Sequence, residues 1–202
     1  MKLHHSKADW NAYYTTPQAF LQNRRIYHPR GKVLGGSSST NAMAYVRGQR
    51  EDYDHWASLG CEGWSFDEVL PYFKKSEHNE QHENEFHARG GLLNVTQATW
   101  YHTKVGEAFI QACVQKGLPL NHDINGQHQE GAGWLQYTMK KSKRQSTAKA
   151  FLEPVIKRSN LTIVTGALCK KLVLQHKRVI GVDFITQNSS TLTARAKQEV
   201  IL

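Results

Sequence analysis

The spacing of hydrophobic residues predicts a series of helices in the first three quarters of the chain. A short helix is expected over residues 51–58. Ser65 and Glu68 have the spacing of a capping box, which predicts the start of a second helix that Pro71 bends or restarts. The clearest predicted helix has apolar residues at helical spacing, at Val105, Ala108, Phe109, Ala112 and Cys113. Gly117 ends this pattern.

Strand-like spacing dominates the last quarter of the chain. Four short runs rich in β-branched residues and separated by turn signals predict a β-meander, at residues 161–165, 168–174, 179–185 and 191–194. The closing residues 199–202 are strand-like too. Earlier, short strands are expected at 92–95 and 134–139, and a helix is expected behind the N-cap Ser146 until Pro154 ends or bends it. Together these elements predict a mixed α/β (α+β) fold.

Residues 77–89 form a polar segment that is rich in histidine. His78 and His82 are four residues apart beside several glutamates, so on a helix they could hold a metal ion. However, the interval from His82 to His87 is one residue too long for the H-E-x-x-H motif. We therefore expect a solvated polar loop and no metal site, with metal catalysis as the minor alternative.

Composition narrows the class of protein. The 202 residues are 39% hydrophobic, enough for one globular domain or two small ones. The net charge of +9 would suit an anionic partner, and the cations are densest at Lys140, Lys141, Lys143 and Arg144. Because no nucleic-acid-binding motif accompanies this cluster, a solvated basic loop and no nucleic-acid partner are expected.

The cysteines and the chain's hydrophobic runs bear on location. The three cysteines lie far apart with no C-x-x-C pair, so free thiols in a reducing compartment are expected for Cys61, Cys113 and Cys169. Neither a signal-like N-terminus nor an apolar run of bilayer length is present. We expect a soluble, cytoplasmic protein and leave a peripheral membrane contact open.

A glycine- and serine-rich stretch at residues 33–43 carries the chemistry. Gly35 and Gly36 have no Cβ, so the chain can turn sharply there and a ligand can lie against the peptide plane. Their N–H groups, three serine hydroxyls and the following helix start could bind an anion such as a pyrophosphate. On chemistry alone, a flexible serine-rich loop is an equal alternative. An aromatic-rich extended segment, residues 9–20, precedes this stretch.

The stretch belongs to a much longer motif. It runs from Tyr27 to Ser38, and further matching residues follow in order at Asn41, Met43, Tyr45, 47–48, 52–54, Trp56, 63–65, 69–77, 91–95, 123–126, 129–131, 146–148, 160–162 and 181–182. This pattern resembles the flavin-binding signature of the glucose-methanol-choline (GMC) oxidoreductases, most of all their choline dehydrogenase and alcohol dehydrogenase branch. The resemblance covers nearly the whole chain.

The resemblance implies a cofactor site and a domain organisation. It implies a discontinuous FAD-binding domain at residues 1–62 and 157–202, interrupted by part of a substrate-binding domain at 63–156. It places four residues along the flavin cofactor: Val33, Gly35, Gly36 and Ser37. It places four more beside the flavin ring, namely Asn41, Ala42, Met43 and Ala44, and Cys169 at the adenine. Thr40 stands where covalently flavinylated members have a histidine, so FAD is expected to be held non-covalently.

The resemblance also implies a reaction, the FAD-dependent oxidation of a primary alcohol, choline-like or aliphatic, by hydride transfer to flavin N5. No catalytic residue is assigned, since none of the eleven histidines matches the family's general base. The dinucleotide fingerprint G-x-G-x-x-G is absent too: Gln136 stands where a third glycine would follow Gly131 and Gly133. An inactive, truncated flavin-domain fragment is therefore the alternative. The alcohol, the electron acceptor and the oligomeric state are left open.

Overall fold

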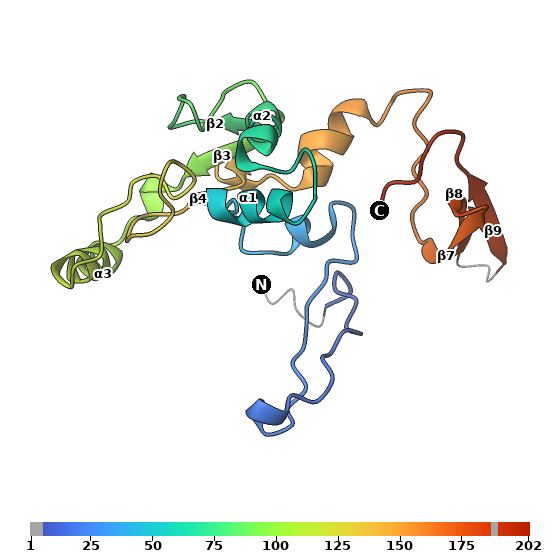
Figure 1. Cartoon of the computed structure of the whole chain (residues 1–202), viewed down its shortest axis with the longest axis horizontal. Coiled ribbons are helices and arrows are strands. Elements are labelled where there is room, and N and C mark those ends of the chain that lie inside the picture. Colours follow the sequence, from blue (N-terminus) through green and yellow to red (C-terminus); the bar gives the residue numbers. More distant parts are fainter. Residues whose placement is uncertain (1–5, 187–189) are drawn as a thin grey trace. The chain divides into compact units, whose positions relative to one another are not determined.

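The computed structural model describes residues 6–186 and 190–202, which form two compact units (Figure 1). The first unit extends to Ile156 and the second runs from Lys157 to Leu202. The mixed α/β composition predicted from the sequence is confirmed in the described residues.

A small four-stranded sheet lies at the centre of the first unit. Its order is β1 (Ala44–Tyr45), β4 (Gln136–Tyr137), β3 (Leu93–Gln97) and β2 (Glu77–Asn79). β4 is antiparallel to both its neighbours, and β2 runs parallel to β3. The register places Ala44 opposite Tyr137, so the end of the glycine-serine stretch is fixed directly to the sheet.

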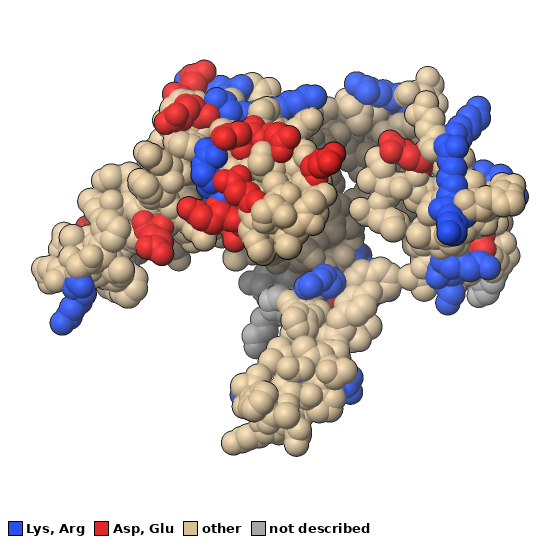
Figure 2. All heavy atoms as spheres, in the orientation of Figure 1, with Lys and Arg blue, Asp and Glu red and all other residues tan. Residues whose placement is uncertain are grey.

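Two capped helices connect β1 to β2 (Figure 1). α1 (Arg50–Ser58) and α2 (Phe66–Ser76) both begin with a capping box, formed in α2 by Ser65 and Glu68 as the sequence predicts. Pro71 lies inside α2 without ending it. Ten acidic and only three basic residues fall in 50–85, and Figure 2 shows acidic side chains gathered over α1 and α2.

α3 (Lys104–Gln115) confirms the clearest predicted helix and follows the short η3 (Thr99–Tyr101). Thr103 caps it by accepting a hydrogen bond from Gly106 N. The predicted apolar face is present but is not buried in this chain, since Val105 is 80% exposed and Phe109 is 68% exposed.

The interior of the first unit is unusually polar. Val95 and Phe66 are buried, but so are Glu77, Asn79 and His87. The prediction that 77–89 is a solvated loop is therefore wrong for these three side chains, which lie in the core, whereas residues 80, 81, 83–85 and 89 are exposed. Buried polar groups need partners, and distant residues supply them: Arg47 pairs with Glu77, Asp123 with His87, and Gln136 with Asn79.

The N-terminal arm of the first unit folds back on itself. The aromatic-rich segment 9–20, predicted to be extended, lies against the chain that leads to the glycine-serine stretch. Isolated antiparallel bridges join the two at Asp9–Gly31, Tyr14–Tyr27 and Gln18–Arg24. The short helix η1 (Ala19–Leu21) lies between Gln18 and Arg24 in the sequence. The glycine-serine stretch itself contains η2 (Gly36–Ser39).

The last part of the first unit brings residues 138–148 alongside the glycine-serine stretch. The predicted strand at 134–139 is divided into β4 and β5 (Met139–Lys140), and β5 forms a tight hairpin with β6 (Lys143–Arg144). The helix expected after Ser146 is a π-helix, η4 (Ala148–Leu152), followed by the 3₁₀-helix η5 (Glu153–Val155), which contains Pro154.

The second unit is an antiparallel meander of β7 (Leu168–Gln175), β8 (Arg178–Ile185) and β9 (Thr191–Arg195). His176 and Lys177, both with positive φ, form the two-residue turn between β7 and β8. Three of the four predicted runs are confirmed as strands. The run 161–165 and the closing residues 199–202 are not strands, because neither pairs with a neighbouring strand.

Among the described residues, no helix is both long enough and apolar enough to cross a membrane.

Candidate functional site

The glycine-serine loop, residues 33–43, has a backbone shape that only glycine adopts easily at two points. Gly35 and Gly36 have φ angles of 85° and 54°, in the left-handed region. A Cβ on Gly35 would lie 3.2 Å from the Cβ of Ala148, whereas a Cβ on Gly36 would meet no protein atom within 4 Å. Gly36 therefore leaves open space where a side chain would lie, while its own N–H is bonded to Val33 O at 2.9 Å.

Two of the three serine hydroxyls in the loop are used inside the protein. Ser38 Oγ donates to Gly35 O, and Ser39 Oγ donates to Leu34 O at 2.8 Å. The expectation that all three hydroxyls serve as ligand donors is therefore corrected. Ser37 differs because its Oγ accepts from Gly31 N at 3.2 Å, so its own hydroxyl proton stays free for a ligand.

The ring-side residues predicted from the family resemblance follow the loop in an exposed, tightly turned segment. Asn41 Oδ1 accepts from Met43 N at 3.0 Å, which stabilises the positive φ of 65° at Met43. Asn41, Ala42 and Ala44 are exposed. Met43 O accepts from Thr138 N at 2.9 Å, and β1 then joins the sheet.

Two residues from the 139–148 region hold the loop in place. Arg144 donates from Nη1 to Ser38 O at 3.0 Å and to Asn41 Oδ1 at 2.9 Å, and from Nη2 to Asn41 O at 2.8 Å. Thr147 donates from its N–H to Ser38 Oγ at 3.0 Å and from Oγ1 to Gly35 O at 3.3 Å. Sequence analysis missed both, since Arg144 was expected to belong to a solvated basic loop.

A hollow of about 540 Å³, the aromatic hollow, opens beside the loop. Gly36 and Ser37 form one side of it, and its other lining residues are aromatic, cationic or small: Trp10, Tyr13, Tyr14, Thr15, His28, Arg30 and Gly31. Lys32 lies 4.8 Å from the ring centroid of Trp10. The sequence placed an aromatic segment before the loop, but not against it.

The aromatic hollow and the loop fit the chemistry of FAD. The residues that line the hollow include no carboxylate, and Arg30 provides a fixed positive charge that would attract a pyrophosphate. Flat aromatic side chains suit the flat rings of the cofactor. Val33, Gly35, Gly36, Ser37 and the ring-side residues could hold it mainly through their backbone.

Cys169 is the one predicted cofactor residue outside the first unit. It lies in β7, opposite Phe184 of β8, and is exposed. The two units are described separately, so its proximity to the adenine stays a prediction.

A buried ionic network ties the loop's sheet to distant segments. Glu77 Oε1 lies 2.8 Å from Arg47 Nη2 and 3.0 Å from His87 Nδ1, and His87 Nε2 lies 3.0 Å from Asp123 Oδ2. Arg47 also donates from Nη1 to Phe86 O at 2.8 Å and from its backbone N–H to Asn125 Oδ1 at 2.8 Å. Two cations and two carboxylates thus balance in the interior.

Opposite charges outweigh burial within this network. Burial acts to lower the pKa of His87, but its contacts with Asp123 and Glu77 raise that pKa above the ordinary value. Burial acts to raise the pKa of Glu77 and of Asp123, yet His87 lowers both below their ordinary values, helped at Glu77 by Arg47. His87, Glu77 and Asp123 therefore favour their charged forms at mildly acidic pH.

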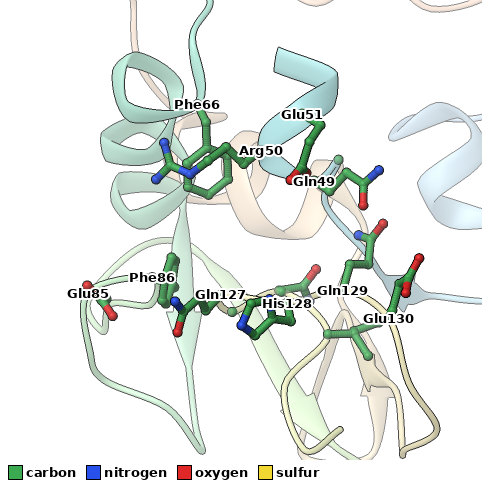
Figure 3. Close-up of a pocket in the computed structure, with 14 residues that line it drawn as sticks. Gln49, Arg50, Glu51, Phe66, Glu85, Phe86, Gln127, His128, Gln129 and Glu130 are labelled. Carbon is green, nitrogen blue, oxygen red and sulfur yellow. The ribbon is translucent and has the colours of Figure 1, made fainter. Parts of the chain in front are cut away.

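A second cavity, of about 530 Å³, lies between the start of α1, Phe86 and residues 124–130 (Figure 3). Its labelled side chains include Glu51, Glu85, Glu130 and His128. None of the nine predicted cofactor residues lines it. Within 6–186 and 190–202, no group of three or more His, Cys, Asp or Glu side chains is arranged to hold a metal ion.

Comparison with known proteins supplies the family. The family model described as GMC oxidoreductase matches residues 12–202. Mitochondrial choline dehydrogenase from Mus musculus is 41% identical over 196 residues, covering 97% of this chain and 32% of that protein. Oxygen-dependent choline dehydrogenase from Rhizobium johnstonii is 42% identical over 190 residues, covering 94% of this chain and 34% of that protein.

Solved structures agree with the sequence relatives. The crystal structure of pyridoxine 4-oxidase from Mesorbium loti matches with a TM-score of 0.90 at 30% identity, over 98% of this chain and 39% of that one. An FAD-dependent oxidoreductase from Chaetomium thermophilum matches with a TM-score of 0.87 at 29% identity, over 95% of this chain and 35% of that one. The chain spans about a third of the length of the curated relatives it matches. Because the family match extends over nearly all of its residues, the chain belongs to the GMC oxidoreductases, a family of flavoproteins.

Proposed function

We propose that this chain supplies the flavin-contacting loop and part of the substrate domain of an FAD-dependent oxidoreductase that oxidises the CH–OH group of a primary alcohol. The observation that carries the proposal is the glycine-serine loop, in which the side-chain-free Gly36 and the hydroxyl of Ser37 line a cation-containing aromatic hollow. The names of the related choline dehydrogenases make a choline-like alcohol the favoured substrate.

The chain's own residues would bind and orient the cofactor. When bound, the flavin would supply the hydride acceptor for alcohol oxidation. The turn at Gly35 and Gly36 and the segment from Asn41 to Met43 would hold and orient the cofactor, and the aromatic hollow beside Gly36 and Ser37 would offer it flat side chains. Thr40 offers no imidazole for a covalent link, which supports non-covalent binding.

The domain assignment and the cellular setting belong to the same proposal. Residues 1–62 and 157–202 would form a discontinuous flavin domain around 63–156, and the division between the two compact units at residue 157 is compatible with one of these boundaries. We propose a cytoplasmic protein with at most peripheral membrane contact, a small alcohol as its partner and no nucleic-acid partner.

The alternative is a chain that cannot turn over by itself. It is favoured by the missing G-x-G-x-x-G fingerprint and by the lack of a histidine that matches the family's base. On either interpretation the 202-residue chain should bind FAD weakly or not at all. Titration of the purified chain, followed by quenching of flavin fluorescence and the visible absorption band, measures this directly, and tight stoichiometric binding would contradict the expectation.

A segment exchange tests the function itself. The matching third of an oxygen-dependent choline dehydrogenase would be replaced by this chain, guided by their 42% identity. We expect the hybrid to retain flavin and to reduce an electron acceptor when choline is added. A hybrid that folds, judged by circular dichroism, but purifies without flavin would refute the proposal.

A further inference from the structure

We propose that Arg144 is a positioning residue of the flavin site: it fixes the shape of the glycine-serine loop and provides an unpaired positive charge behind it. This inference rests on the proposed function. It concerns a residue outside the flavin signature, about 100 positions further along the chain than the loop that it contacts.

The contacts of Arg144 fall on the second half of the loop, at Ser38 and Asn41. Its guanidinium bridges Ser38 O, Asn41 Oδ1 and Asn41 O with three bonds of 2.8–3.0 Å. Asn41 Oδ1 in turn accepts from Met43 N. Arg144 thus determines the orientation of the same amide side chain that stabilises the strained turn at Met43, beside the expected flavin ring.

The hairpin of β5 and β6 is built to deliver this side chain. Lys141 and Ser142 both have positive φ, at 49° and 59°, and close a two-residue turn. The register sets Arg144 opposite Met139, next to Thr138, whose N–H is bonded to Met43 O. The turn conformation therefore places Arg144 alongside the loop, whereas its neighbour Lys143 is exposed.

The charge of Arg144 has no opposite charge beside it in the described part of the chain. Its hydrogen-bond partners there are neutral carbonyl oxygens, and no carboxylate pairs with it. A planar guanidinium holds several fixed acceptors in a rigid fork, whereas the three donors of a lysine ammonium rotate freely and do not reproduce that geometry. The loop therefore lies over a fixed cation, and such a charge favours an anionic ligand on its open side.

Three variants separate the two roles. Arg144→Lys keeps the charge but loses the fork, Arg144→Gln loses both, and Lys143→Gln is the matched control on the same hairpin. In the full chain, we expect amide exchange of residues 38–43 to accelerate by roughly ten- to a hundredfold in Arg144→Gln, the effect of losing hydrogen bonds to a charged group. The exchange rate in Arg144→Lys should lie between those of the parent chain and Arg144→Gln, and the rate in Lys143→Gln should equal that of the parent chain.

The flavin readout uses the hybrid enzyme described above. We expect FAD affinity to fall in the order parent, Arg144→Lys, Arg144→Gln, and the visible flavin band to shift in both variants. The inference would be overturned if amide exchange of residues 38–43 accelerated while FAD affinity stayed the same. It would also be overturned if amide exchange of these residues did not change. If instead the parent hybrid holds no flavin, the proposed function fails first, and the exchange data still show whether Arg144 orders the loop.

Discussion

Replacing Glu77 by glutamine should destabilise the first unit far more than any surface change. Glu77 has a fully buried side chain that contacts Arg47, His87 and the backbone N–H of Ala88 through one oxygen. Glutamine keeps the shape but removes the negative charge, which leaves the buried Arg47 and His87 facing a neutral group. Breaking a buried ion pair in this way costs about 3–5 kcal/mol.

The magnitude is large compared with the stability of a typical domain, about 5–15 kcal/mol. Urea unfolding followed by tryptophan fluorescence measures it selectively, because all five tryptophans precede residue 157 and report on the first unit alone. Glu85→Gln is the matched control, since Glu85 is exposed, and should change stability by no more than about 0.5 kcal/mol.

A double variant tests the proposed pairing. If Arg47 and Glu77 stabilise each other, Arg47→Gln combined with Glu77→Gln should cost less than the sum of the two single changes, with a coupling of about 0.5–3 kcal/mol. A loss below about 1 kcal/mol for Glu77→Gln alone, or strictly additive single effects, would refute the view that this network stabilises the unit.

Three further outcomes are expected. The pKa of His87 is raised, so the stability that His87 contributes is complete below its ordinary pKa of 6.5 and is lost as pH rises through its folded pKa. The pKa values of Glu77 and Asp123 are lowered, so the stability that they contribute is lost on acidification. The urea midpoint should therefore peak at mildly acidic pH, and in His87→Gln it should fall less steeply on the alkaline side. Gly31→Ala would place a Cβ 2.2 Å from Gly36 O and should cost about 1–3 kcal/mol by thermal unfolding. The exposed strand β9 should promote aggregation, so Leu192→Lys should reduce light scattering of the purified chain.

Local patterns predicted the elements whose signals lie within a few residues of each other. The capping box at Ser65, the repeat of α3 and the strands β7, β8 and β9 were all found in this way. The run 161–165 has the same composition as its neighbours but no pairing partner, so β propensity alone could not make it a strand.

The interior of the first unit could not be predicted from local composition. Residues 77–89 look like a solvated loop because Glu77 and His87, which pair with each other in the folded unit, need further partners that are not nearby in the sequence. Arg47 and Asp123, some thirty residues before and after, supply those partners only once the chain folds. Arg144 shows the same limit: within a run of four cations, nothing in the sequence distinguishes the one that contacts the glycine-serine loop.

The inward-turned hydroxyls of Ser38 and Ser39 have a consequence for protein engineering. Since these side chains hold the loop together instead of touching a ligand, substitutions there would change the shape of the loop before they changed its selectivity. A designer who wished to alter cofactor preference should leave them intact and vary the wall of the aromatic hollow. At Trp10, Tyr13 and His28, new side chains would change the lining of the hollow directly.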